Sequence, residues 1–228
     1  HRTPFSGRNQ QYYSEDSNYG YMVGAVEAAA MQANGVNYCV KHFAMNDQES
    51  GRESLSTFAN EQTVRETYLR AFEGAFVEGG AQSVMTAFNR IGVVYAAVNV
   101  PLLKNVLRGE WGFLGFVETD YFGVYGYMTA DQGVRNGSDL MLCTTGNDFN
   151  KMTVLTNSSK QAMRTSAKNI LYTVVNSRAY EAENLNPGMA KWKVILIGAD
   201  VVAALLIVGL EYTAIKNYKK RKEEEEEV

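Results

Sequence analysis

The feature that most constrains the fold is an alternation of short apolar runs and amphipathic stretches. The apolar runs cover residues 36–43, 83–88 and 116–119, and the amphipathic stretches that alternate with them cover residues 18–32, 60–76 and 101–107. Short runs rich in β-branched and aromatic residues predict strands, and apolar residues at three- and four-residue steps predict helices. Alternating strands and helices indicate an α/β fold with a parallel sheet.

The helices are expected to turn their apolar residues towards that sheet. These residues are Met22, Ala25, Val26, Ala29 and Ala33 in the first helix, and Ala162, Ala167, Ile170, Leu171 and Val174 in a later helix at 158–175. A helix at 130–136 and a strand at 139–143 extend the pattern. The chain offers four or five strand–helix units, whereas a closed eight-fold barrel takes about 250 residues. Residues 1–180 are therefore expected to form the later units of an incomplete TIM-like (β/α) barrel.

The C-terminal part of the chain is different in kind. Residues 194–210 are almost wholly apolar and reach the lower end of the roughly 17 to 25 residues that span a bilayer. Trp192 and Tyr212 stand where interfacial aromatic residues are expected, and more lysine and arginine follows the span than precedes it. This charge bias predicts a cytoplasmic C-terminus and an extracellular barrel domain.

We accordingly expect a single-pass protein of the cell membrane, with lipid as the partner of one helix. Its parts would be the barrel domain at 1–180, a linker at 181–193, a transmembrane helix at 194–215 and a charged cytoplasmic tail at 216–228. Asp200 is the objection, because a carboxylate within a span is costly unless it is protonated or paired. The alternative is a buried helix of a soluble protein.

Composition excludes several function classes. A net charge of −3, with no broad basic patch in the first 190 residues, argues against a nucleic-acid partner. The only histidines are His1 and His42, so a histidine-rich metal centre is not expected, and no cofactor is indicated. Cys39 and Cys143 lie in separate apolar runs without Cys-x-x-Cys spacing, which favours free thiols. Because His1 stands in place of a methionine, we expect a fragment or a processed product.

Polar residues at the strand ends point to chemistry. Asp120 follows one predicted strand, and Lys41 and His42 end another. Carboxyl ends of parallel strands meet at one rim, where ligands bind in α/β folds. With Arg8 added, the donors suit the vicinal hydroxyls of a sugar, and the Tyr121 ring suits the apolar face of a pyranose. The bases would also hold the carboxylate ionised, as a retaining glycosidase requires of its nucleophile.

Each of these residues also has a purely structural interpretation. Asp120 can cap a helix or turn, Lys41 can pair with Glu49, His42 can be a satisfied core histidine, and Arg8 can be a solvated loop residue. Their joint placement is the argument for a site.

Six ordered segments give the chain a family resemblance over about residues 2–178. They are GRNQQYYSED (7–16), KHFAMNDQE (41–49), RETYLRAFE (65–73), MTAFNRIG (85–92), LRGEWGFLG (107–115) and TDY (119–121). The chain resembles glycoside hydrolase family 3. The resemblance implies a TIM-like barrel that acts on β-glycosides with net retention, with Asp120 as the nucleophile. It implies that Arg8, Lys41 and His42 bind the hydroxyls of the sugar, and that Tyr121 replaces the usual tryptophan beside the nucleophile.

The chain departs from the family pattern in three ways. Phe88 stands where many members carry a tyrosine, so one hydroxyl contact is lost. The early barrel strands, which bring a further sugar-binding aspartate, would precede His1. The acid/base, usually a glutamate of a separate α/β sandwich domain, is also missing, and no histidine at 44–57 replaces it. The resemblance therefore implies a family member in which the order of the domains is permuted. A sandwich domain upstream of His1 would then supply the acid/base.

The sequence thus predicts the C-terminal part of a membrane-anchored, exo-acting, retaining β-glycosidase, a β-glucosidase in particular. Asp120 would form a glycosyl-enzyme from the terminal β-linked sugar of a glycoside or oligosaccharide. Expressed alone, the chain should show little or no turnover.

Two alternative functions remain. The first is a non-catalytic, membrane-anchored carbohydrate-binding protein with a decayed barrel, which Phe88 and Tyr121 favour. The second is a purely structural tethered domain.

Overall fold

The computed structural model describes residues 1–122, 126–144, 150–181, 185 and 187–226. The chain divides into two compact units, His1–Tyr180 and Glu181–Val228, and each is described by itself.

A parallel sheet forms the centre of the first unit. Its strands are β1 (Cys39–Phe43), β3 (Ser83–Thr86) and β6 (Phe116–Glu118), in the order β1-β3-β6. Val40 lies opposite Val84, and Val84 lies opposite Val117, in parallel register. The α/β fold and the parallel sheet predicted from the sequence are confirmed.

The predicted strand at 139–143 is wrong. Only Leu140 pairs with the sheet, through a single parallel bridge to Glu118. The reason is the side chain of Thr119, whose Oγ1 accepts a hydrogen bond from the Leu142 amide at 3.1 Å. A side chain thus takes a backbone donor at the point where a longer strand would need it.

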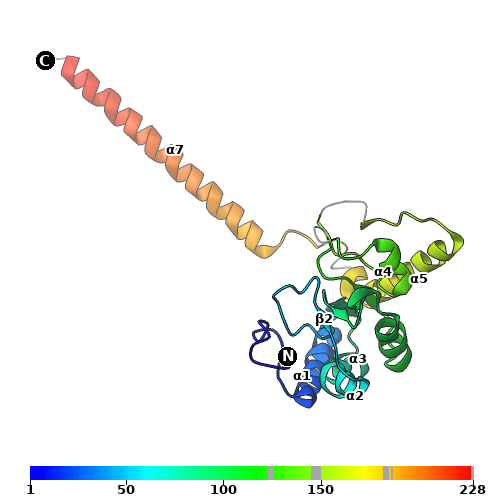
Figure 1. The fold of residues 1–228 in the computed structure, drawn as a ribbon. Helices are drawn as coiled ribbons and strands as arrows, with labels where there is room; N and C mark the ends of the chain where they lie inside the picture. The colour runs from blue at the N-terminus through cyan, green and yellow to red at the C-terminus, as the bar shows by residue number, and fades with distance from the viewer. Residues whose placement is uncertain (123–125, 145–149, 182–184, 186, 227–228) are drawn as a thin grey trace. The chain divides into compact units, whose positions relative to one another are not determined.

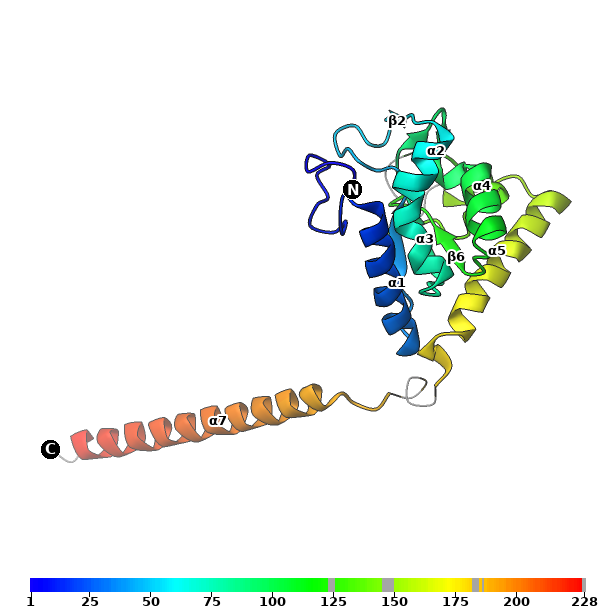
Figure 2. The same ribbon diagram turned by 90° about the horizontal axis from the view of Figure 1, so that it is seen from below.

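The helices surround this sheet in chain order (Figure 1). They are α1 (Ser17–Ala33), α2 (Glu61–Thr63), η1 (Val64–Leu69), α3 (Arg70–Val77), η2 (Ala96–Val98), η3 (Pro101–Glu110), α4 (Ala130–Asn136), α5 (Asn157–Val175) and η5 (Arg178–Tyr180). Polar side chains cap the helix starts: Asp16 Oδ1 accepts from the amides of Asn18 and Tyr19. Asn60 Oδ1 accepts from the Thr63 amide, and Pro101 occupies the first turn of its helix. Figure 2 shows α3 and α5 on opposite sides of β6.

The hydrophobic core lies between the sheet and these helices. Phe43, Val84, Leu103, Leu107 and Val117 are fully buried in it. The Phe43 ring meets Phe72 edge to face at 5.2 Å between centroids. Because the core fills the space behind the strands, the strand ends are left for polar side chains.

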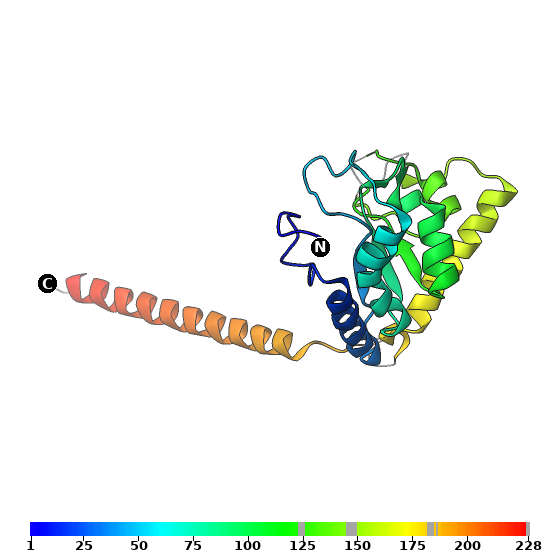
Figure 3. The ribbon, with the colours of Figure 1, turned by 60° about the horizontal axis from the view of Figure 1, so that its bottom comes forward.

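Helix α1 packs against α3 (Figure 3), and of its residues predicted to point inward only Ala25 is buried. Its buried residues are Gly20, Gly24, Ala25 and Ala28. Met22 and Val26, predicted to point inward, are 57% and 71% exposed, and Ala29 and Ala33 are exposed as well. Glycines explain the rotation, because they let the two helices approach closely: a Cβ atom at Gly74 would lie 2.2 Å from the Tyr21 carbonyl oxygen.

The buried face of α5 is polar rather than apolar. It consists of Ser159, Ser166, Asn169 and Thr173. Asn169 Nδ2 donates to Asp139 Oδ1 at 3.0 Å, and Thr173 Oγ1 donates to the Gln82 carbonyl at 2.9 Å. Ala167 and Leu171, predicted to be inward, are exposed. Hydrogen bonds to the sheet thus decide which face of this helix turns inward.

A second small sheet, which the sequence analysis missed, lies in the loops beyond the strand ends. It consists of β2 (Ser56–Thr57), β4 (Arg90–Ile91) and β5 (Val94–Tyr95), with β2 parallel to β4 and β4 antiparallel to β5. The turn between β4 and β5 passes through Gly92 at a φ of 62°, which glycine adopts without strain.

The second unit consists mainly of α7 (Lys191–Glu226). Within the described residues, this is the one helix long and apolar enough to cross a membrane, with a mean hydropathy of 2.4 in its most apolar window. None of that window is buried by the rest of the chain.

Candidate active site

Three of the predicted site residues meet above the end of β3. His42 Nε2 lies 3.6 Å from Asp120 Oδ2, and Arg8 Nη1 lies 3.4 Å from His42 Nε2. His42 belongs to β1, and Asp120 comes two residues after β6. Because β3 separates these strands, their backbones should lie about 10 Å apart, twice the usual strand spacing. The side chains therefore lean towards each other across the end of the middle strand.

Asp120 is almost completely enclosed, with 8% of its surface exposed. Its Oδ1 accepts a hydrogen bond from the Tyr121 amide at 2.7 Å, whereas Oδ2 is buried and has no hydrogen-bond partner among the described residues. Burial raises the pKa of Asp120, and the Tyr121 amide and the charges of Arg8 and Lys41 only partly oppose this. The surrounding bases therefore lower the pKa of Asp120 by less than burial raises it.

His42 is buried and neutral. Burial, followed by the charges of Arg8 and Lys41, lowers its pKa to about 3. His42 therefore contributes hydrogen bonds, not positive charge, to its surroundings at neutral pH. Its other ring nitrogen, Nδ1, lies 2.8 Å from the hydroxyl oxygen of Tyr12.

Arg8 is fixed by Glu49, a residue that sequence reasoning did not assign to the site. Arg8 Nε and Nη2 donate to the two Glu49 oxygens at 2.6 and 2.8 Å. Arg52 Nη1 donates to the same carboxylate at 3.0 Å. A paired arrangement of this kind orients a guanidinium as well as binding it. Local spacing could have indicated the Glu49–Arg52 pair, three residues apart in the loop after β1, but not the pairing of Glu49 with Arg8.

Lys41 does not pair with Glu49, contrary to the structural alternative considered for it. Its side chain is exposed, and the described residues place no ion-pair partner on it. Its charge nonetheless acts on the pKa of Asp120 and of His42. Lys41 is therefore available to a ligand at the rim.

The two residues that depart from the family pattern are held by protein contacts. The Tyr121 hydroxyl lies 2.7 Å from Thr144 Oγ1. Phe88 is fully buried, and the Arg52 guanidinium carbon lies 4.6 Å from the centroid of its ring. Phe88 therefore supports Arg52 by a cation–π contact and does not line an open surface.

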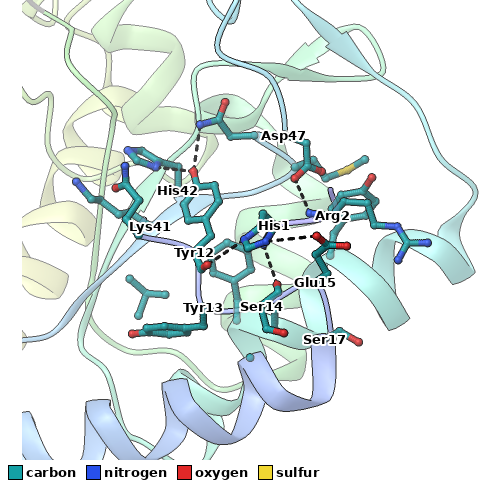
Figure 4. Close-up of a pocket in the computed structure, with 18 of the residues that line it drawn as sticks. His1, Arg2, Tyr12, Tyr13, Ser14, Glu15, Ser17, Lys41, His42 and Asp47 are labelled. Atoms are coloured by element: carbon teal, nitrogen blue, oxygen red, sulfur yellow. Dashed lines mark hydrogen bonds and ion pairs between the residues drawn. The ribbon is translucent and has the colours of Figure 1, made fainter. Parts of the chain in front are cut away.

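A cavity of about 230 Å³ adjoins the site on the side of β1 (Figure 4). Figure 4 shows Lys41 and His42 on one side of it and Arg2, Glu15 and Asp47 on the other. Arg8, Asp120 and Tyr121 are not among its described lining residues. The structure thus brings Arg8, His42 and Asp120 together, and this cavity opens beside them.

In the part of the chain that the structure describes, no three His, Cys, Asp or Glu side chains lie close enough together to hold a metal ion. Cys39 and Cys143 are free and half-buried.

Comparison with known proteins decides the family. Residues 1–168 match the profile of the Glycosyl hydrolase family 3 N terminal domain. The chain belongs to glycosyl hydrolase family 3. Family 3 relatives include a β-glucosidase of Rhizobium radiobacter, 34% identical over 185 residues, which cover 79% of this chain and 22% of the relative. β-Glucosidase B of Emericella nidulans is 40% identical over 140 residues, which cover 61% of this chain and 16% of the relative.

The fold agrees with solved structures of the family. β-Glucosidase 3B from Thermotoga neapolitana in complex with glucose superimposes with a TM-score of 0.69 at 32% identity. The aligned part covers 81% of this chain and 27% of that one. The chain thus spans about a quarter or less of the length of these family 3 relatives.

Proposed function

We propose that this chain carries the nucleophile of a retaining, exo-acting β-glycosidase of family 3, a β-glucosidase in particular. The observation that carries the proposal is the buried Asp120 carboxylate, 3.6 Å from His42 and beside Arg8, at the carboxyl end of a parallel strand. The relatives named β-glucosidases support the substrate class.

In the proposed mechanism, an oxygen of Asp120 attacks the anomeric carbon while the glycosidic bond to the leaving group breaks. A glycosyl-enzyme results, and water hydrolyses it with inversion at each step and net retention. Arg8, Lys41 and His42 bind the hydroxyls of the sugar, and the Tyr121 ring lies against its face. Because the pKa of Asp120 is raised, its carboxyl group ionises at a higher pH than an ordinary aspartic acid does. The ionised carboxylate is the nucleophile.

The acid that protonates the leaving group is assigned to a sandwich domain upstream of His1. Of the described residues near Asp120, His42 is neutral and Tyr12 has a pKa of about 12, raised by burial. Neither group matches the role of a catalytic acid near neutral pH. The chain expressed alone should therefore turn over ordinary glycosides slowly or not at all.

Trapping of the glycosyl-enzyme tests the function. The 2,4-dinitrophenyl 2-deoxy-2-fluoro-β-glucoside has a leaving group that departs without protonation, so the missing acid does not prevent labelling. We expect one fluoroglucosyl group on Asp120 by peptide mass spectrometry, in this chain and in the complete protein. Asp120→Asn should carry none. A label on another residue, or no label in the complete protein, would reject the mechanism.

The second candidate is a carbohydrate-binding protein without catalysis. Phe88 in place of tyrosine and Tyr121 in place of tryptophan favour it. It would show a rise in melting temperature with glucose but no label on Asp120. A purely structural domain would show neither response.

We also propose that α7 anchors the protein in the cell membrane as a single span at 194–215, with the first unit outside and residues 216–228 in the cytoplasm. The apolar window and the basic residues that follow it support this orientation. The test is extraction of membranes at alkaline pH, followed by protease treatment of intact cells. Release into the soluble fraction, or an epitope at the C-terminus that is cleaved from outside, would contradict the anchor or its orientation.

A further inference from the structure

The ring of Tyr127 packs at the same two strand ends that carry the candidate site. Its centroid is 5.3 Å from that of Phe88, which follows β3, and 5.4 Å from that of Phe122, which comes two residues after Asp120. Both contacts are edge to face, and Phe88 and Phe122 are fully buried. The ring of Tyr95 makes a third contact at 5.2 Å. Aromatic packing therefore fixes Tyr127 beside the strand end that carries Asp120.

The hydroxyl group of Tyr127 is buried and has no hydrogen-bond partner among the described residues. Within those residues it is the one buried, unpaired side-chain oxygen or nitrogen that has a proton to donate. Thr119 is near enough to lower the pKa of Tyr127, but the two side chains do not have the geometry of a hydrogen bond. A buried donor without a partner costs free energy, and folded proteins seldom keep one without a use for it.

Asp120 has the complementary unpaired group. Its Oδ2 is buried and accepts no hydrogen bond from the described residues. Burial, followed by the charge of Asp120, raises the pKa of Tyr127. The phenol therefore keeps its proton at neutral pH, and it lies within the electrostatic reach of Asp120. A donor and an acceptor thus lie in one region of the molecule, and the described residues offer neither of them a partner.

The neighbouring phenols do not share this property. The hydroxyl oxygen of Tyr95 accepts from Arg90 Nη2 at 2.8 Å, and the hydroxyl of Tyr121 lies 2.7 Å from Thr144 Oγ1. Among the described aromatic residues around Asp120, Tyr127 is therefore the one whose hydroxyl is available to a ligand.

We propose that Tyr127 is a further sugar-binding residue, whose hydroxyl donates a hydrogen bond to a hydroxyl group of the glycoside bound at Asp120. A sugar hydroxyl both accepts and donates, so one sugar ring can satisfy the Tyr127 hydroxyl and Asp120 Oδ2 together. Neighbouring side chains cover both atoms in the structure, so these side chains must move when the sugar binds. The class of ligand rests on the proposed function.

The first test needs no sugar and uses the full chain in detergent micelles. Tyr127→Phe removes the hydroxyl and keeps the ring, so the melting temperature should stay the same or rise, because no hydrogen bond within the protein is lost. Tyr95→Phe is the matched control from the same group of rings. Its melting temperature should fall, because the hydroxyl that accepts from Arg90 is lost. A fall for Tyr127→Phe would show that its hydroxyl already has a protein partner, and would overturn the proposal.

The second test is glucose binding by the complete protein, measured by isothermal titration. We expect Tyr127→Phe to weaken the affinity about tenfold, because one hydrogen bond to the sugar is lost, and Tyr95→Phe to leave it unchanged. Equal affinities of the unaltered protein and Tyr127→Phe would overturn the role of Tyr127 and leave the proposed function in place. If the unaltered protein bound no glucose, the proposed function and the sugar contact would both be rejected.

Discussion

Glu49 binds Arg8 with both oxygens at 2.6 and 2.8 Å and so sets the direction of the guanidinium above His42. Glu49→Gln removes the charge and one acceptor while keeping the size of the side chain. Hydrogen bonds to charged groups contribute about 1.5–3 kcal/mol, so sugar affinity should fall about tenfold. Isothermal titration with glucose measures this. Glu53→Gln is the control, because Glu53 lies 3.8 Å from Arg52 and does not contact Arg8. Equal affinities of the two variants would show that Arg8 needs no such support.

On acidification, His42 should contribute a loss of stability to the fold. Its pKa is lowered to about 3 in the folded chain from an ordinary value of 6.5. Between these values the unfolded chain binds a proton that the folded chain does not, so the free energy of unfolding rises with pH across this window. The contribution is at most about 1.4 kcal/mol per pH unit.

His42→Gln should flatten that dependence, and His1→Gln should leave it unchanged. Burial raises the pKa of Asp120, Glu118 and Asp139, and these groups favour the folded state in acid, so the comparison between variants isolates the histidine. Thermal unfolding followed by near-ultraviolet circular dichroism between pH 4 and 7 gives the slopes. A slope in His42→Gln as steep as in the unaltered chain would refute the assignment.

Arg108→Met should destabilise the first unit strongly. Arg108 Nη2 donates to the buried Asp139 Oδ2 at 2.7 Å, and Nη1 donates to the Gly115 carbonyl at 3.0 Å. Removing one member of a buried ion pair leaves an uncompensated charge and costs about 3–5 kcal/mol. Chemical denaturation measures the loss. Arg65→Met, which breaks an exposed pair with Glu110, should have little effect. Similar losses in both variants would contradict a special role for the buried pair.

The approach of α1 to α3 should tolerate a methyl group at one glycine and not at another. A Cβ atom at Gly74 would lie 2.2 Å from the Tyr21 carbonyl oxygen, whereas at Gly24 its nearest neighbour would be 3.5 Å away. Gly74→Ala should therefore lower the melting temperature. Gly24→Ala should leave it unchanged or raise it, since alanine favours a helix over glycine by about 1 kcal/mol. The reverse order would mean that the helices do not meet at Gly74.

The sequence predicted the parallel sheet and the juxtaposition of Arg8, His42 and Asp120, because strand periodicity and strand ends are local properties. It did not predict Glu49 as the partner of Arg8, since an ion pair across 41 residues leaves no local pattern. It named the charges that lower the pKa of Asp120 but not the burial that raises it. Burial outweighs the nearby charges, and burial depends on the packing of the whole unit.

The inward faces of two helices were predicted less well than their positions. Hydrophobic periodicity favoured Met22 and Val26, but close approach selects glycine and alanine on α1. On α5, Asn169 and Thr173 turn inward because their side chains donate hydrogen bonds to acceptors on the side of the sheet. In both helices, the surface on which the helix packs decides which face turns inward. The sequence of the helix alone does not show this.

Among the described residues β1 pairs with β3 alone, and Lys41 is the exposed residue at its middle. In this chain expressed alone, an exposed lysine on such a strand discourages the same strands of two molecules from pairing. A Lys41→Met variant made to test sugar binding would therefore also be more prone to associate and less soluble. Weaker sugar binding by this variant can be assigned to the missing ammonium group only when it is measured on freshly isolated monomer.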